Sequence, residues 1–308
     1  MKFSRTFVML MLFFSFLFIG KTYADGNGNT ITLGVTIPLS GSHAAKGTAM
    51  LRAVQMYIEN INKNNGINGK KVDIVIEDDK NTPEGAREAA LKLVKNKKIT
   101  GIIGHYYSSS LMAAAKIYDE AGIPVISPYS SNSVIAKSKW LFSINVGDED
   151  QGKFMAVYLN KILNKKNVLL IHTDDPYGMG LKNGFTGKAQ KLNITVNKTL
   201  SFNQRESISD DYIAKNLKIA EIAKIESVVI LTHSREGLKL VKQIRDFGIK
   251  TLILGPNTFS SNVFIKDLPE SYTRDVYVTS PFLWELATET AYKDRKSTRL
   301  NSSHGKLS

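Results

Sequence analysis

Hydroxyl-bearing residues follow two strand-like runs of this chain and stand where helices are expected to begin. The run TGIIG leads to Tyr107 and Ser108, and the run IPVISP leads to Tyr129 and Ser131. In a parallel sheet the carboxyl ends of neighbouring strands lie side by side, so both junctions would line one crevice with free N–H groups and hydroxyls. Such a crevice suits an anion, for example a carboxylate. Serine also caps helices at strand-to-helix turns, so the pattern alone leaves capping and ligand binding open.

Short β-branched runs alternate with amphipathic stretches from Asn29 onward. The runs TITLGVTIP and KVDIVIED have the composition of buried strands, and Met50, Val54 and Ile58 recur between them at helical spacing. Thr82 precedes Pro83 as an N-cap residue would before the first position of a helix. The pattern predicts an α/β chain of repeated βα units with parallel sheets.

A second series of the same kind begins near residue 148. Its strand-like runs are NVLLIHTD, ITVNKTLSF, ESVVILTH and KTLILGP, and DVYVTSPF then resembles a return to the first series. We therefore expect two doubly wound, Rossmann-like lobes joined by a hinge of several chain crossovers, an arrangement that suits closure over a ligand. The expected boundaries are 25–147 plus 278–293 for lobe 1 and 148–277 for lobe 2, with crossovers at 145–149 and 277–281.

The first 24 residues have the pattern of a secretory signal peptide. Lys2 and Arg5 precede an apolar run from 7 to 20, and the small-residue pattern before Ala24 is typical of a cleavage site. The apolar run is short for a bilayer span, which needs roughly 20 residues. We expect cleavage after Ala24 and a periplasmic location; an uncleaved N-terminal anchor is the alternative.

The last segment, 294–308, has almost no apolar residues and no periodicity. Its run DRKSTRLNSSH resembles one translated reading frame of a sequencing adapter, so we expect the native sequence to break near Lys293 and the first lobe to be truncated. A basic, disordered tail is the alternative. The leader carries three basic residues, and this segment carries four together with Asp294, so without both the net charge of +13 falls to +7.

Several function classes have little support in the sequence. The remaining positive charge is spread in short lysine runs without interleaved aromatic residues, which argues against a nucleic-acid partner. The absence of cysteine excludes disulfides, thiolate nucleophiles and cysteine-ligated metals. No GxSxG or HExxH motif occurs, and the run GDEDQGK (147–153) is followed by Phe154, not by the Ser or Thr that completes a phosphate-binding GxxxxGK loop. The adjacent Asp174 and Asp175 make a poor acid/base pair. We expect no enzyme, no metal and no cofactor.

Six motifs occur in a fixed order along the chain: IPLSGSHAAKG (37–47), NGINGKKVDIVIEDD (65–79), IIGHYYSSS (102–110), IPVISPYSS (123–131), DPYGMGL (175–181) and GPN (255–257). Each is weak alone, but their order and spacing over residues 30–293 resemble the Leu/Ile/Val-binding branch of the type I periplasmic binding proteins of ABC importers. The resemblance implies a monomeric protein that captures a small carboxylate-bearing ligand, such as a branched-chain amino acid or a related acid or amide, and delivers it to a membrane permease and its ATPase. The sensory domain of a receptor is the alternative, because receptors use the same bilobed fold.

The resemblance also implies roles for particular residues. Ser108 and Ser131 would grip the ligand carboxylate by hydroxyl and N–H, with Tyr107 beside them and the carbonyl of Tyr129 in the same crevice. Tyr177 of the second lobe would close over the ligand, although a tyrosine in a DPYG turn can equally be a packing residue.

Three positions depart from the family pattern. Asn257 stands where amino-acid-binding members place the carboxylate that pairs with the ligand ammonium, and a neutral amide makes a weaker partner for an ammonium. Lys46 stands where an aromatic residue commonly lines the side-chain pocket, and His233 replaces a tyrosine. Lys46 could meet a second ligand carboxylate or remain solvated, and His233 could equally be a satisfied histidine at a strand end. These departures put a plain α-amino acid ligand in doubt.

Overall fold

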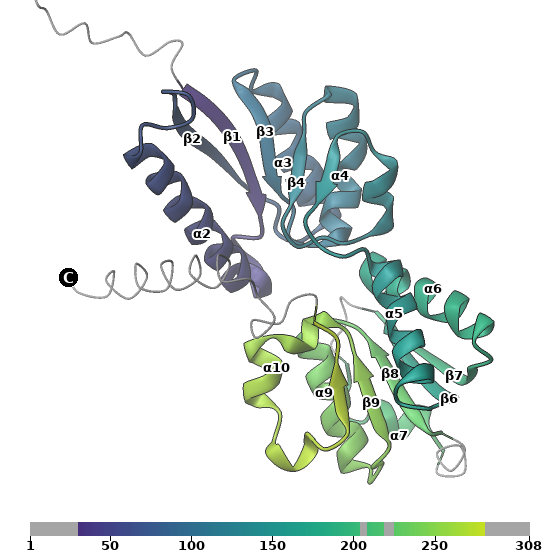
Figure 1. The fold of residues 1–308 in the computed structure, drawn as a ribbon. Coiled ribbons are helices and arrows are strands. Elements are labelled where there is room, and N and C mark those ends of the chain that lie inside the picture. The colour runs from purple at the N-terminus through teal and green to yellow at the C-terminus, as the bar shows by residue number, and fades with distance from the viewer. Residues whose placement is uncertain (1–29, 204–207, 219–224, 281–308) are drawn as a thin grey trace, which may run out of the picture.

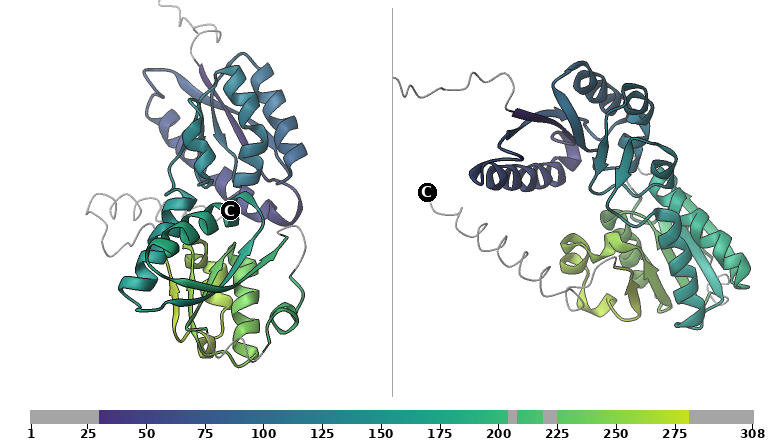
Figure 2. Two further views of the ribbon diagram at one scale, coloured as in Figure 1. Left: turned by 90° about the vertical axis from the view of Figure 1, so that its right-hand side faces the viewer. Right: turned by 45° about the horizontal axis from the view of Figure 1, so that its top comes forward.

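The computed structural model describes residues 30–203, 208–218 and 225–280 and shows two α/β lobes (Figures 1 and 2). Each lobe contains a five-stranded sheet in which every pair of neighbouring strands is parallel. The prediction of two doubly wound lobes is therefore confirmed.

The first sheet has the strand order β2-β1-β3-β4-β5. Its elements, in chain order, are β1 (Thr30–Ile37), η1 (Gly41–His43), α2 (Ala44–Lys63), β2 (Lys71–Asp78), α3 (Pro83–Lys95), β3 (Ile99–Gly104), α4 (Ser108–Ala121), β4 (Val125–Ser127), η2 (Ser133–Lys137) and β5 (Leu141–Ser143).

The second sheet has the strand order β10-β9-β8-β6-β7. Its elements are α5 (Asp148–Lys161), β6 (Asn167–Thr173), α6 (Pro176–Lys191), β7 (Thr195–Phe202), α7 (Tyr212–Asn216), β8 (Ser227–Leu231), α9 (Ser234–Asp246), β9 (Leu252–Gly255), η3 (Asn257–Ser260), α10 (Asn262–Asp267), η4 (Glu270–Tyr272) and β10 (Val276–Val278).

The run DVYVTSPF lies in the second lobe as far as residue 278. Its residues Val276–Val278 form β10, which pairs with β9 of the second sheet, so this lobe extends one residue beyond the expected boundary at 277, and the return to the first lobe stays a prediction. Val276 and Tyr277 pack against the two hydrophobic clusters of that lobe, which holds the strand there. The leader at 1–24 and the segments 281–293 and 294–308 lie outside the described residues.

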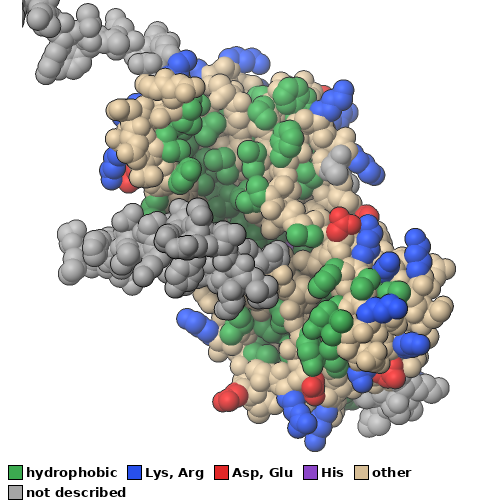
Figure 3. All heavy atoms as spheres, in the orientation of Figure 1, with side chains coloured by type: hydrophobic (Ala, Val, Ile, Leu, Met, Phe, Trp, Pro, Cys, Tyr) green, Lys and Arg blue, Asp and Glu red, His purple; other side chains and the backbone are tan. Residues whose placement is uncertain are grey.

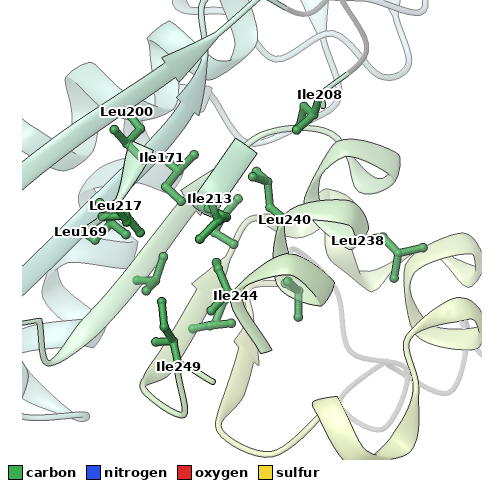
Figure 4. Close-up of a cluster of buried hydrophobic side chains, with 14 of the residues drawn as sticks. Leu169, Ile171, Leu200, Ile208, Ile213, Leu217, Leu238, Leu240, Ile244 and Ile249 are labelled. Atoms are coloured by element: carbon green, nitrogen blue, oxygen red, sulfur yellow. The ribbon is translucent and has the colours of Figure 1, made fainter. Parts of the chain in front are cut away.

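The core of the second lobe follows from the two-residue period of its strands. In β6, Leu169 and Ile171 enter one cluster, part of which is drawn in Figure 4, while Val168 and Leu170 enter the cluster on the opposite face. Both faces are buried, which is why the run NVLLIHTD is almost continuously apolar.

The two faces of the first sheet are buried to different extents. In β4 and β5, Val125 and Leu141 are buried in the cluster under α3 and α4, whereas Ile126 and Phe142 point the other way and are half exposed. Apolar side chains gather on the exposed face of this lobe in Figure 3. None of the described helices is long and apolar enough to cross a membrane.

Helices α5 and α6 pack together through glycines. A Cβ atom on Gly184 of α6 would lie 2.0 Å from the carbonyl oxygen of Glu149, and one on Gly152 of α5 would lie 2.1 Å from that of Leu181. Only a residue without a side chain permits this backbone-to-backbone approach, so the two helices form one tightly packed pair at the start of the second lobe.

We predict that Gly184→Ala lowers the free energy of unfolding by about 1–3 kcal/mol, because the new methyl group would force the two helices apart. Gly187→Ala is the matched control, since that glycine lies in the same helix with no atom within 4 Å of the added Cβ. This control should stabilise the protein by up to about 1 kcal/mol through helix propensity. Chemical denaturation checks both values, and equal effects of the two substitutions would contradict close packing at Gly184.

Candidate functional site

The two serine-bearing junctions meet at the carboxyl edge of the first sheet. Tyr107 is the N-cap residue of α4 and Ser108 is its first residue, and both are buried. The hydroxyl of Ser130, which follows β4, donates to the hydroxyl of Ser108 over 3.0 Å. The expected crevice of hydroxyls and helix N–H groups is therefore present in the fold.

A chain of buried hydrogen bonds supports these serines from below. The N–H of Ser130 donates to the hydroxyl of Ser127 (2.9 Å), which in turn donates to the carbonyl oxygen of His105 (2.9 Å). The ring of His105, fully buried, contacts a carboxylate oxygen of Asp79 through Nδ1 (2.7 Å) and the hydroxyl of Tyr118 through Nε2 (3.0 Å). The serine junctions are thus tied to the ends of β2 and β3.

We predict that Ser127→Ala destabilises the fold by about 1–3 kcal/mol, because it leaves the N–H of Ser130 and the carbonyl of His105 buried without this partner. Ser109 in the first turn of α4 is the matched control: no side-chain hydrogen bond is found for it among the described residues, and Ser109→Ala should change stability by less than about 0.5 kcal/mol. Urea unfolding distinguishes the two variants. Indistinguishable unfolding midpoints would mean that the hydrogen-bond chain through Ser127 does not fix the serine junctions.

The residues expected to bind a ligand converge on one cavity between the lobes. Its volume is about 10 Å³, room for about one water molecule. A larger ligand requires the lining side chains, or the lobes, to move apart. The cavity is lined by Tyr106, Tyr107, Ser108, Tyr129, Ser131, Tyr177, His233, Asn257 and Thr258. Seven of the eight predicted residues are in this set. Lys46 is not, and its Nζ lies 3.3 Å from the hydroxyl of Tyr107. Their roles toward a ligand stay predictions.

Contacts between the lobes concentrate beside this cavity. The N–H of Asp148, the first residue of α5, donates to the carbonyl of Ser131 (2.9 Å), and the hydroxyl of Ser131 donates to a carboxylate oxygen of Asp148. The side-chain amide of Asn132 donates to the carbonyl of Pro176 (2.8 Å). The crossover near residue 148 therefore connects a cavity-lining serine directly to the second lobe.

Asp148 is a buried acid in contact with the cavity-lining Ser131, and the sequence interpretation missed it. Its side chain is buried, and its second carboxylate oxygen, Oδ2, has no hydrogen-bond partner among the described residues. Burial raises the pKa of Asp148 to about 7; the hydroxyl of Ser131 opposes that rise and the nearby carboxylate of Asp175 adds to it. In sequence, Asp148 looks like an ordinary acid in the first turn of a helix, where acids are favoured. Only its place under Ser131 distinguishes it.

A second carboxylate stands on the same side of the cleft. Asp175 caps α6 by accepting from the N–H of Gly178 (2.9 Å), and its other oxygen pairs with Nε2 of His233 (2.8 Å). Burial alone would raise the pKa of Asp175, but His233 and the hydrogen bonds lower it below its ordinary value. Asp175 therefore favours its ionised form and orients the imidazole of His233 toward the cavity.

Aromatic rings pack around the cavity from both lobes. His233 stacks on Tyr177, with centroids 4.8 Å apart, and meets Tyr107 of the first lobe edge-on at 5.4 Å. The hydroxyl of Tyr177 donates to the side-chain oxygen of Asn257 over 3.0 Å. Asn257, the neutral residue of the GPN motif, thus already has a partner within its own lobe.

Comparison with known proteins agrees with this architecture. A family model described as "Periplasmic binding protein" matches residues 30–300, and the chain therefore belongs to this family. An amino acid binding protein of Pseudomonas aeruginosa is 32% identical over 221 residues, which cover 71% of this chain and 58% of that protein. The Leu/Ile/Val-binding protein of Escherichia coli is 28% identical, with 82% and 67% of the two chains covered. This chain thus spans about three fifths of the Pseudomonas protein's length.

Solved structures show the same fold. The branched-chain amino acid transporter substrate binding protein LivJ from Streptococcus pneumoniae, in complex with isoleucine, has a TM-score of 0.68 and 27% identity, covering 81% of this chain and 70% of that chain. The leucine binding protein LivK from Thermotoga maritima has a TM-score of 0.77 at 23% identity, covering 90% and 77%. A benzoate-bound solute binding protein from R. palustris has a TM-score of 0.72 at 20% identity, covering 85% and 71%.

Proposed function

We propose that this protein is exported to the periplasm, captures a small α-amino acid between its two lobes and delivers it to the permease and ATPase of an ABC importer. Its family and the functions of its relatives support capture of a small solute. The identity of the ligand, the location and the delivery step are our inference.

The first lobe supplies the site for the ligand carboxylate. Ser108 presents its hydroxyl at a helix N-terminus, and helix N–H groups favour an anion. Ser131 lies at the neighbouring junction, where its hydroxyl would have to turn from Asp148 to donate to a ligand carboxylate. Ser108 is held by Ser130, so its hydroxyl is oriented before the ligand arrives. A carboxylate bound there gains hydrogen bonds without a fixed positive charge from the protein.

Asp148 would give the site its preference for an amino acid over an acid that lacks an amino group. A buried carboxylate with an unpartnered oxygen costs free energy unless a cation or donor reaches it. Asp148 lies under Ser131, so an ammonium next to a carboxylate held by Ser131 would be close to it. With Asp175 nearby, the second lobe supplies the negative charge that Asn257 lacks. We therefore assign the ammonium to Asp148.

Closure follows from this division between the lobes. The carboxylate end belongs to the first lobe, while Asp148, Tyr177 and His233 belong to the second, so one ligand contacts both. A ligand shifts a conformational equilibrium only by its difference in affinity for the two states. A ligand that pairs with groups of both lobes binds the closed state better and stabilises it.

We predict that L-leucine stabilises the purified protein, whereas its des-amino analogue 4-methylpentanoate does not, because only the amino acid supplies an ammonium to Asp148. A thermal-shift panel measures this: at a hundredfold excess over Kd the stabilisation is about 2.7 kcal/mol. Benzoate, urea and acetamide extend the panel to amino-free acids and amides. Equal stabilisation by leucine and 4-methylpentanoate, or stabilisation by benzoate or amides alone, would overturn the amino-acid assignment.

Affinity for an amino acid should increase with pH through the pKa of Asp148. That pKa is raised to about 7 mainly by burial, and a bound ammonium favours the ionised carboxylate. Below about pH 7, binding must therefore remove a proton, and affinity should fall by up to about tenfold per pH unit. Titration calorimetry between about pH 5.5 and 8.5 tests this.

The variant Asp148→Asn is measured over the same pH range, and its affinities are compared with those of the wild type. Asp175, His233 and Glu149 also face Asp148, so only the part of the pH dependence that the substitution removes belongs to Asp148. Because folding raises its pKa above the ordinary 3.8, the wild-type carboxyl costs stability as pH rises through that interval. The variant should therefore melt about 2–4 °C higher at pH 8 without ligand while binding more weakly. An unchanged pH profile would remove Asp148 from the site.

A further inference from the structure

Basic side chains gather at the N-terminus of α2, next to the cavity. His43 is the N-cap residue of this helix, Lys46 lies in its first turn, and the first turn contains no acid. The positive end of a helix dipole disfavours cations, so Lys46 stands where helix energetics alone would place an acid. Its position needs another explanation.

Both side chains reach the same cavity-lining residue. Nδ1 of His43 lies 2.8 Å from the hydroxyl of Tyr107, and Nζ of Lys46 donates to that hydroxyl over 3.3 Å. Nζ also lies 5.7 Å from the ring centroid of Tyr107 and 5.9 Å from that of Tyr106, within range of a cation–π interaction. Lys46 is therefore directed at the tyrosines that line the cavity, not at bulk solvent.

Lys46 has no carboxylate partner. It is half-buried, yet none of the ion pairs within the described ranges includes it. Burial lowers its pKa, while Glu236 raises it and Arg235 lowers it, which shows that both residues of α9 lie within electrostatic reach across the cleft. A phenol and two ring faces satisfy an ammonium poorly, because the desolvated charge lacks a counter-ion.

The second lobe does not cancel this charge. Glu236 and Arg235 occupy the first turn of α9 and carry opposite charges, so together they add no net charge. Three positive features remain beside Tyr107: Lys46 and the N-termini of α2 and α9. An anion entering from the cavity would approach all three.

We propose that Lys46, with the N-terminus of α2, forms a subsite for a second carboxylate, so that the preferred ligand is an acidic amino acid such as L-glutamate or L-aspartate. This inference rests on the proposed amino-acid function. The main-chain carboxylate and ammonium occupy the serine junctions and Asp148, and the side-chain carboxylate displaces the hydroxyl of Tyr107 as the partner of Lys46. The tyrosines contact the methylene groups between the two ends.

Titration calorimetry of the purified protein with L-glutamate, L-aspartate, L-glutamine and L-leucine tests the proposal. In the wild type, glutamate or aspartate should bind at least about tenfold more tightly than glutamine, since only the acid pairs with Lys46. In Lys46→Met that preference should disappear, with glutamine affinity unchanged within about twofold. Lys46→Arg keeps the charge and should retain the preference.

Lys63→Met in the last turn of α2 is the matched control, because it removes one exposed lysine from the same helix. It should preserve the preference for the acid. If leucine or glutamine binds as tightly as glutamate and Lys46→Met leaves the ratios unchanged, the acidic subsite is wrong while the amino-acid function stands. If none of the four amino acids binds the folded wild type, the proposed function itself fails and the subsite with it.

Discussion

The buried hydrogen-bond chain from Asp79 to Ser108 is the constraint on which the first lobe's site depends. It links groups from the ends of β2, β3 and β4, and each polar group in it is removed from water, so each must keep its partner. Sheet pairing alone fixes the strands but leaves the loops beyond them free to adopt several conformations. The hydrogen-bond chain removes that freedom. The hydroxyls of the two serine junctions are held in place by Asp79 and His105, neither of which lines the cavity.

The sequence predicted those parts of the structure that repeat. Strand period, helix period and N-cap residues gave the βα units, and the rule that parallel strands end at one edge brought Ser108 and Ser131 together correctly. The parts it missed depend on single long-range contacts. Asp79 and His105 lie 26 positions apart, and nothing in their local sequence marks them as a pair. Asp148 is one of three acids at the start of a helix, and the sequence does not show that it contacts Ser131.

The path of the chain at DVYVTSPF could not be read from the sequence for a related reason. A short apolar strand fits the edge of either sheet, and its own composition does not choose between them. The choice is made by packing, because Val276 and Tyr277 complete clusters on both faces of the second sheet. The same argument applies to Lys46, whose environment is decided by Tyr106 and Tyr107 and not by the neighbours along its helix.

The glycine contact between α5 and α6 has a mechanical consequence. Asp148 begins α5 at the crossover between lobes, and Tyr177 lies in the first turn of α6 at the cavity. Because the backbones of these helices are in contact, neither helix can slide far past the other, and the two helices would move together. A rotation at the crossover would then carry Tyr177 with it. The position of the first turn of α6 therefore follows the orientation of the crossover at Asp148, whatever ligand occupies the cavity between the lobes.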